Sequence, residues 1–377
     1  MKILIAPDSF KDCMAALEVA NFLARGILKV DAEAEIRKLP MADGGEGTVE
    51  SLIDATGGRI IKVQVHDPLL REVPSFYGIS GDGSTAVIEM AAASGLELLK
   101  QSERNPWLTS TRGTGELIVH ALDQGCSKIL LGIGGSATND CGMGMARALG
   151  VAFLDDEGKA VPQGGGALGE VRQISMEDLD PRIANTEIEV ACDVTNPLSG
   201  PKGASFVYGP QKGADREMVE KLDYNLQHMA RLIREQLEKE IDTIPGAGAA
   251  GGLGAGLMAF LDARLVKGFD MVAEAVSLEG AIQWADLVIT GEGKMDRQTL
   301  YGKTPMGVAK MAQKYGKAVI GVAGTLEEDA VELYGEGFDV IMPIQEKPTD
   351  LASALENAPL LLEHAGERIA RMLKIQL

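Results

Sequence analysis

Five short loops of one kind recur along this 377-residue sequence. Each follows an apolar run and combines Asp or Glu with Gly, Ser, Thr or Asn; they lie at residues 7–11, 42–48, 134–140, 193–197 and 291–296. Glycine-rich loops expose backbone N–H groups that suit phosphate, and carboxylates suit Mg²⁺ or accept a proton. The pattern therefore indicates phosphoryl transfer rather than nucleotide binding alone.

Strand and helix patterns alternate in the first and last parts of the chain. Short aliphatic runs predict buried strands at residues 2–6, 287–290, 318–323 and 340–343, and residues 35–39 are a further strand candidate. Helical periodicity lies between or after them, at residues 15–30, 48–55, 304–315 and 360–373. This alternation predicts an α/β fold with a discontinuous, doubly wound, Rossmann-like domain built from residues 1–62 and 286–377.

The middle of the chain has a different texture. Closely spaced β-like runs predict antiparallel hairpins at residues 60–65, 73–77 and 85–90. We expect residues 63–285 to form an inserted mixed α/β domain; two sequential domains divided near residue 150 are the alternative. A Gly/Ala-rich stretch at residues 245–256 fits a hinge, a second ligand loop or tight helix packing, and we favour the ligand loop.

The charge balance restricts the partners of the protein. A net charge of −19 argues against nucleic acid and against an anionic membrane surface. An anionic substrate would need local Lys or Arg, backbone N–H groups or a metal. The four cysteines form no Cys-x-x-Cys pair, so neither a disulfide framework nor a zinc site is expected. With no leader and no apolar stretch of membrane-spanning length, we expect a cytoplasmic protein.

The strongest phosphate candidate lies at residues 129–140, where an apolar strand runs into a Gly-Gly turn. A helix after that turn would bring its N-terminus and several N–H groups to one place. The candidate ligands are Gly134, Gly135, Ser136, Thr138 and Asn139. The alternative is a plain strand–helix turn in which Asn139 or Asp140 caps the helix.

Other loops place acids and bases together. Asp8 and Lys11 follow the first predicted strand; a helix cap and a solvated lysine are the alternative. Glycines crowd the loop that carries Asp43 and Glu46, which suggests metal or hydroxyl recognition rather than a simple Asx turn. Asp193 ends another apolar strand and could accept a proton from an attacking hydroxyl, unless it is only a turn residue.

Residues 291–296 place Glu292 and Asp296 near Lys294, as metal and phosphate ligands or as a solvated loop. Residues 302–304 mimic the tail of a P-loop, but the first glycine of that motif would fall at Arg297. We therefore expect an ordinary helix there, with Thr304 as its N-cap.

These loops, in this order, resemble bacterial glycerate kinases of the type that begins with an Ala-Pro-Asp-Ser-Phe-Lys segment. The matching segments cover the chain nearly end to end, at residues 5–11, 40–48, 110–118, 132–140, 192–198, 209–214 and 287–302. Two departures are Leu70 and Cys141, which stand where a glycine is usual.

The resemblance implies ATP-dependent phosphorylation of D-glycerate with Mg²⁺, in a cleft between two α/β domains. It favours 2-phosphoglycerate as the product, as in the glycerate 2-kinase type, but the residues alone leave 3-phosphoglycerate open. A nicotinamide-dependent hydroxy-acid oxidoreductase is less favoured, because the first strand does not lead into G-x-G-x-x-G. A non-catalytic sensor is another alternative, and whether the chain forms a homodimer stays open.

The residues also supply a mechanistic hypothesis. We expect the 134–139 loop and Lys294 to bind ATP phosphates, and Lys11 to counter the developing negative charge. The expected Mg²⁺ ligands, direct or through water, are Asp43, Glu292 and Asp296. Asp193 is the first candidate base and Asp8 the second. The predicted contacts to glycerate are Asp43, Glu46, Arg71 and Lys212.

Overall fold

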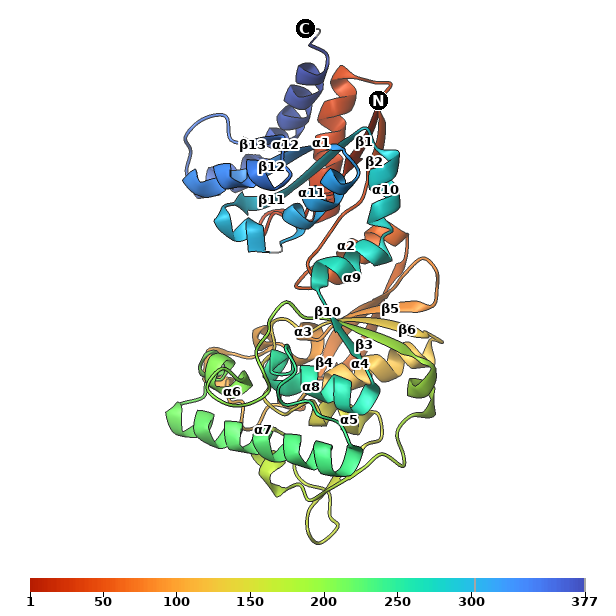
Figure 1. Ribbon diagram of the computed structural model, residues 1–377, viewed down its shortest axis with the longest axis vertical. Coiled ribbons are helices and arrows are strands. Elements are labelled where there is room, and N and C mark those ends of the chain that lie inside the picture. The colour runs from red at the N-terminus through yellow and green to blue at the C-terminus, as the bar shows by residue number, and fades with distance from the viewer. Residues whose placement is uncertain (302, 376–377) are drawn as a thin grey trace. The chain divides into compact units, whose positions relative to one another are not determined.

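A computed structural model of the chain describes residues 1–301 and 303–375 (Figure 1). Gly302, which ends the last of the matching segments, lies outside the described residues. The chain forms two compact units: the first contains Met1–Asp43, Glu50–Gly57 and Val272–Leu377, and the second Gly44–Val49 and Gly58–Met271. These limits differ from the predicted residues 62 and 286, because residues 59–62 pair within the sheet of the second unit and residues 278–284 form a helix of the first.

The first unit is built on a five-stranded parallel sheet in the order β13-β12-β11-β1-β2. Its strands are β1 (Lys2–Ile5), β2 (Glu35–Lys38), β11 (Leu287–Met295), β12 (Ala318–Leu326) and β13 (Val340–Pro343). Its helices are α1 (Ala16–Val30), α10 (Leu278–Trp284), α11 (Thr304–Lys314) and α12 (Leu351–Leu373). The sheet places β1 between β11 and β2.

Alternating side chains of these strands face opposite sides of the sheet. Ile3 and Ile5 share a core with α1 and α12, whereas the buried Leu4 belongs to the other face. The two helices approach closely, since a Cβ at Gly26 of α1 would lie 1.9 Å from the carbonyl oxygen of Glu363. Helices on such a parallel sheet confirm the predicted α/β class.

The second unit has a six-stranded sheet in the order β10-β9-β6-β5-β4-β3. Its strands are β3 (Arg59–His66), β4 (Glu72–Ile79), β5 (Thr85–Glu89), β6 (Lys128–Gly132), β9 (Glu187–Ala191) and β10 (Arg264–Val266). The pairs β3–β4 and β4–β5 are antiparallel, as predicted, whereas β5, β6, β9 and β10 run parallel. A separate antiparallel pair joins β7 (Ala152–Leu154) to β8 (Gln173–Ser175).

Helices of very different length complete the second unit. They are α3 (Ala91–Ser94), α4 (Arg112–Asp123), α5 (Met143–Ala148), α6 (Ala204–Tyr208), α7 (Arg216–Leu237) and α8 (Ala249–Leu261). Two further helices cross the limits between the units, α2 (Thr48–Thr56) and α9 (Gly268–Ala275). Short 3₁₀ helices are η1 (Leu96–Leu98), η2 (Gln101–Glu103), η3 (Gly165–Glu170), η4 (Pro181–Asn185), η5 (Pro210–Lys212), η6 (Arg297–Tyr301) and η7 (Glu328–Glu336).

Three local predictions are wrong. Residues 291–295 are the second half of β11 and pair with β12, so they are not a loop. The N-cap of α11 is Lys303, which leaves Thr304 inside the helix. The last helix begins at Leu351, nine residues before the predicted start at residue 360, and continues through Pro359. The helix expected after the Gly-Gly turn is present and begins at Met143, and residues 133–142 form a long loop before it.

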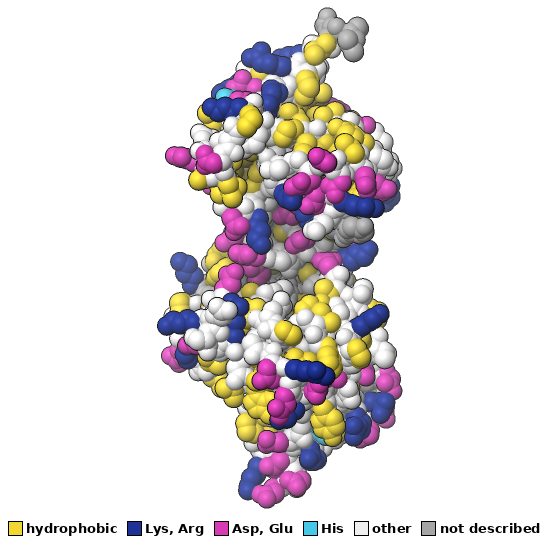
Figure 2. Space-filling view, turned by 90° about the vertical axis from the view of Figure 1, so that its left-hand side faces the viewer, with side chains coloured by type: hydrophobic (Ala, Val, Ile, Leu, Met, Phe, Trp, Pro, Cys, Tyr) yellow, Lys and Arg dark blue, Asp and Glu magenta, His cyan; other side chains and the backbone are white. Residues whose placement is uncertain are grey.

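Acidic and basic side chains are interspersed on the face of the molecule in Figure 2, where no extended basic patch gathers. Within residues 1–301 and 303–375, no helix combines the length and the apolar composition that a membrane span requires.

Candidate active site

In the first unit, three acidic side chains gather at the carboxyl ends of parallel strands. Asp8 follows β1, Asp43 follows β2, and Glu292 lies in the second half of β11. The backbone fixes Asp8, because its N–H donates to the carbonyl of Gly291 (2.8 Å) and its Oδ1 accepts from the N–H of Ser9 (2.7 Å). In open parallel sheets this edge is where ligands bind.

The carboxyl group of Asp8 is largely buried, and this changes its acidity. Burial raises the pKa of Asp8 to about 7; the nearby Thr304 side chain opposes the rise, and the negative charges of Asp43 and Glu292 add to it. A carboxylate whose pKa lies near the working pH is suited to accept a proton from a hydroxyl group.

Glu292 is held by two donors in the same unit. The Thr299 hydroxyl donates to Oε1 (2.7 Å), and the Lys303 ammonium donates to Oε2 (2.9 Å). Burial raises the pKa of Glu292, and Lys303 and Thr299 oppose that rise. A positive charge therefore sits beside the acidic group, on a lysine that we expected only to precede a capped helix.

The predicted cations Lys294 and Lys11 differ in their surroundings. Lys294 is more than half exposed and forms ion pairs with Glu327 (2.8 Å) and Asp296 (3.7 Å). Lys11 is exposed, in a turn whose backbone at Lys11 lies close to Gly293 of β11. Lys294 is thus already neutralised by carboxylates, which argues against its predicted role with phosphate.

The carboxylates of the first unit fit a metal only in part. Among the residues that the structure describes, no group of three His, Cys, Asp or Glu side chains is placed to hold a metal ion. Asp296 turns back on its own loop, where its Oδ1 accepts from the N–H of Gln298 (2.8 Å). Mg²⁺ commonly takes one or two carboxylates together with water and substrate phosphates, and Asp43 and Glu292 fit that arrangement better than a complete protein cage.

In the second unit, loops also gather at the carboxyl ends of parallel strands. The 44–49 segment packs there, since a Cβ at Gly44 would lie 2.4 Å from the Cβ of Ala191, the last residue of β9. Oε1 of Glu89, the last residue of β5, accepts from the N–H of Val49 (2.9 Å). Glu46 is exposed on this segment.

The 133–142 loop follows β6 at the same edge. Gly134 and Gly135 are exposed, whereas Ser136, Thr138 and Asn139 are buried. Asn139 uses its amide to donate to the Ser205 hydroxyl (3.0 Å) in α6. The glycines therefore present the backbone to a ligand, while the side chains of Thr138 and Asn139 lie inside the unit.

Asp140 ties this loop to two helices. Its buried carboxylate accepts from the N–H and the hydroxyl of Thr111, at the start of α4, and from the N–H groups of Gly142 and Gly144, at the start of α5. Burial raises the pKa of Asp140, although these donors oppose the rise. The N-cap of α5 is Gly142, so Asp140 binds N–H groups at the start of the helix without being the N-cap that the sequence offered as an alternative.

Lys212 lies inside the second unit, 1% exposed, beneath the 133–142 loop. Its ammonium donates to the Ser136 hydroxyl (2.8 Å) and to the carbonyl of Thr138 (2.7 Å). Burial lowers the pKa of Lys212 to about 7, and the negative charge of Asp140 opposes that change. A direct contact between Lys212 and substrate, as predicted, does not fit this burial.

Asp193 follows β9 at the same edge and is exposed. Its Oδ1 accepts from the N–H of Gly268 (3.1 Å), the first residue of α9. The turn role and a catalytic role are both compatible with this position, but Asp193 lacks the burial that distinguishes Asp8.

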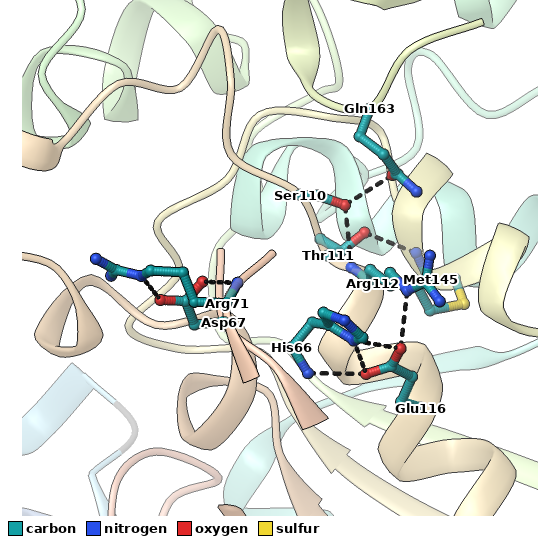
Figure 3. A network of polar contacts seen from close by, with 9 residues as sticks. All are labelled: His66, Asp67, Arg71, Ser110, Thr111, Arg112, Glu116, Met145 and Gln163. Carbon is teal, nitrogen blue, oxygen red and sulfur yellow. Dashed lines mark hydrogen bonds and ion pairs between the residues drawn. The ribbon is translucent and has the colours of Figure 1, made fainter. Parts of the chain in front are cut away.

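Arg71 folds back onto its own turn (Figure 3). Its guanidinium forms ion pairs with Asp67 (2.5 Å) and Glu103 (2.7 Å). The N–H groups of Arg71 that could bind a substrate carboxylate are already bound to Asp67 and Glu103. The pairing therefore argues against the predicted role of Arg71 in substrate binding.

Leu70, in the same turn, has φ of +63°, and Cys141 has φ of +53°. Both departures from the family pattern thus occupy left-handed positions, where glycine avoids a steric cost.

We expect Leu70→Gly to raise the free energy of unfolding by up to about 1 kcal/mol, because relief of strain exceeds the added chain entropy. Urea denaturation measures the change. Leu70→Ala is the control, since it keeps the Cβ; equal stability of the two variants would contradict the strain.

The segment 110–118 has a structural role (Figure 3). The Ser110 hydroxyl donates to Gln163 (2.9 Å), and the Thr111 hydroxyl accepts from the N–H of Met145 (2.9 Å). Glu116 accepts from Arg112 (2.8 Å) and from the N–H of His66 (2.8 Å). The segment locks α4 to the 133–142 loop, to α5 and to β3.

Sequence reasoning missed three polar groups of these two clusters, namely Lys303, Thr304 and Glu89. Lys303 and Thr304 lie in a Gly-Lys-Thr sequence like the end of a P-loop motif. We did not assign them a ligand, because the first glycine of that motif is missing. Glu89 carried a weaker signal, an acid at the end of an apolar strand.

Comparisons with known proteins identify the relatives of the chain. The sequence profile of the glycerate kinase family matches residues 3–374. The chain is 52% identical over 375 residues to a glycerate kinase of Bacillus subtilis (strain 168), and 48% identical over 375 residues to the glycerate 2-kinase of Escherichia coli (strain K12). Each alignment covers 100% of this chain and 98% of the relative. A crystal structure from Salmonella typhimurium LT2, assigned as glycerate kinase 2, superposes with a TM-score of 0.92 at 49% identity, over 99% of this chain and 98% of that one.

Proposed function

The chain belongs to the glycerate kinase family, and we propose that it transfers the γ-phosphoryl group of ATP to a hydroxyl of D-glycerate, giving 2-phosphoglycerate. The observation that carries the chemistry is the group of Asp8, Asp43 and Glu292 at the carboxyl edge of the first sheet, with Lys303 beside it. The product with phosphate at position 3 is the remaining alternative. The family match gives no support to a nicotinamide-dependent oxidoreductase.

Asp8 is our proposed general base, ahead of Asp193. As the glycerate oxygen bonds to the γ-phosphorus and the bond to the ADP oxygen breaks, the hydroxyl proton passes to the Asp8 carboxylate. The support is burial, because it raises the pKa of Asp8 to about 7, whereas Asp193 is exposed. A stronger base at a fixed position accepts the proton more readily.

Charge neutralisation is the second task of the site. Mg²⁺, bound with the nucleotide, supplies positive charge at the phosphates, and Asp43 and Glu292 would hold it together with water. Lys303 and Lys11 are the proposed protein cations at this edge. Lys303 is paired with Glu292 of the acidic group, whereas Lys294 is paired with Glu327 and Asp296 outside that group. A protein of net charge −19 needs such local cations to bind two anionic substrates.

The 134–136 backbone is the proposed phosphate cradle in the second unit. Its support is the exposure of Gly134 and Gly135 at the carboxyl end of β6, the edge at which parallel sheets bind ligands.

A coupled assay tests the reaction directly. With ATP, Mg²⁺ and D-glycerate we expect steady ADP release that requires all three, and L-glycerate serves as the matched control. Phosphorus and proton NMR of the product then identifies the phosphorylated carbon. Absence of ADP formation with D-glycerate, together with turnover of another hydroxy acid, would replace glycerate as the substrate; a 3-phosphate would leave the kinase and correct only the position.

A further inference from the structure

The buried lysine of the second unit lacks an acidic partner. Within residues 1–301 and 303–375, no carboxylate lies within ion-pair distance of the Lys212 ammonium. The nearby Asp140 acts on it only through space, because its oxygens accept from Thr111, Gly142 and Gly144. Burying a cation is costly unless another group uses its charge. Packing of helices and strands alone does not explain why a lysine is buried at position 212, whereas a ligand that uses its charge would explain it.

The backbone holds Lys212 in a fixed place. It ends η5 (Pro210–Lys212), and the next residue, Gly213, has φ of +95°. A Cβ at Gly213 would lie 2.2 Å from the carbonyl oxygen of Arg104, so this turn is packed against the chain at residue 104. The ammonium thus reaches the 133–142 loop from a rigid support.

The hydrogen bond from Lys212 restricts the orientation of the Ser136 hydroxyl. Its oxygen accepts from the Lys212 ammonium, which has protons only to donate. The hydroxyl proton of Ser136 is consequently left to donate elsewhere. Beside it, the N–H groups of Gly134 and Gly135 make no hydrogen bond to the part of the chain that the structure describes. The N–H groups of Gly134 and Gly135 and the hydroxyl of Ser136 are therefore three consecutive donors, at the carboxyl end of β6, that are available to a ligand.

We propose that Lys212 is a positioning residue for the nucleotide phosphate chain: from beneath the loop it turns the Ser136 hydroxyl toward the anion that the Gly134 and Gly135 N–H groups bind. This inference rests on the proposed function of the 134–136 loop. In its protonated form the amine also places a positive charge behind that loop, where the dry interior weakens it less than solvent would. The anion is the phosphate chain rather than the glycerate carboxylate, because consecutive N–H groups and a hydroxyl match several phosphate oxygens.

The test compares Lys212→Met with Lys239→Met. Lys239 donates to the carbonyl of Ala259 (2.7 Å), at the far end of α8, and so controls for the loss of a part-buried lysine of the same unit. By calorimetry at a temperature well below both unfolding transitions, we expect Lys212→Met to weaken binding of ADP and of inorganic tripolyphosphate by about tenfold or more. Lys239→Met should lower Tm and leave both affinities unchanged. In steady state, Lys212→Met should raise KM for ATP and leave KM for D-glycerate near the wild-type value.

Unchanged affinity in folded Lys212→Met would overturn the proposal, and so would a rise confined to KM for D-glycerate. If Lys212→Met does not fold, Ser136→Ala decides instead, because it keeps the lysine and removes the hydroxyl. We expect it to weaken tripolyphosphate binding severalfold, and no effect would again overturn the proposal. Gly135→Val tests whether the 134–136 loop binds phosphate at all, independently of Lys212. If this variant binds ADP like the wild type, the loop is not the phosphate cradle and its proposed function is wrong.

Discussion

Asp8→Asn should lower kcat by about 10²- to 10⁴-fold while making the protein more stable at pH 8. The amide removes the proposed base, but its oxygen can still accept from the Ser9 N–H. The carboxylate is costly to bury, so its neutral replacement relieves the folded protein of a penalty. Steady-state kinetics and urea denaturation on the same preparation measure the two effects. A loss of activity accompanied by a loss of stability would point to a structural role for Asp8.

The pH dependence of this prediction follows from the direction of the shift. Since the pKa of Asp8 rises from 3.8 to about 7 on folding, the native state binds more protons than the unfolded state between these values. Stability therefore falls as pH rises through that window, and the penalty is complete above about pH 7. It amounts to at most about 4 kcal/mol, the size of the gain expected for Asp8→Asn at pH 8. The gain should vanish below about pH 3, where Asp8 is protonated in both the folded and the unfolded state.

Activity should show the opposite trend with pH. Asp8 accepts a proton only when ionised, so kcat/KM, which reports on the free enzyme, should rise through about pH 7 in the wild type. Asp193→Asn is the matched comparison, because it changes an exposed carboxylate of the second unit in the same way. If Asp193→Asn abolishes the rise and Asp8→Asn keeps it, then Asp193 is the base.

The fold was predictable where local patterns coincide with burial. The aliphatic runs of β1, β11 and β12 are buried in the first unit, so composition and length identify these three strands directly. Antiparallel β3 and β4 were predicted because their β-like runs follow each other closely along the chain. The domain limits were harder, because residues 59–62 alternate like any strand and only their partner in β4 assigns them to the second unit.

The site was less predictable, because burial and pairing are properties of the folded chain. Asp8, Asp43 and Glu292 were chosen for their place after apolar runs, and topology brings their three strands side by side. Nothing local distinguishes Lys294, which is paired with Glu327, from Lys303, which faces Glu292. Likewise, Lys212 was chosen as a cation near the right loop, but only packing shows that it lies beneath that loop.

The glycine-rich stretch at residues 245–256 illustrates the same limit. Ala250, Gly251 and Gly252 are consecutive left-handed residues at the start of α8, with φ of +54°, +70° and +88°. Close packing against the 138–141 backbone, rather than the favoured ligand loop, is what the structure assigns to them. The sequence shows that glycines are concentrated at this stretch. The 138–141 backbone, which leaves no room for a side chain there, lies more than a hundred residues earlier in the chain.

Gly251→Ala should be the most damaging conservative substitution near the phosphate loop. The new Cβ would lie 1.9 Å from the carbonyl oxygen of Thr138 and 2.6 Å from the Cα of Asn139. The left-handed conformation alone costs about 1–2 kcal/mol with a Cβ, and forced displacement of packed atoms adds about 1–3 kcal/mol. We therefore expect the free energy of unfolding to fall by about 2–5 kcal/mol, measured by urea denaturation.

Gly125→Ala separates strain from displacement. Gly125 has φ of +83° in the same unit, but a Cβ there would meet nothing within 4 Å. It should cost only the conformational share, about 1–2 kcal/mol, and leave the kinetics unchanged. Gly251→Ala, by contrast, must push the 138–141 backbone away, and a displacement of about 1 Å can reduce turnover on the order of 100-fold. If the two variants lose the same stability and both keep the wild-type KM for ATP, then the left-handed turn at residues 250–252 does not set the position of the phosphate loop.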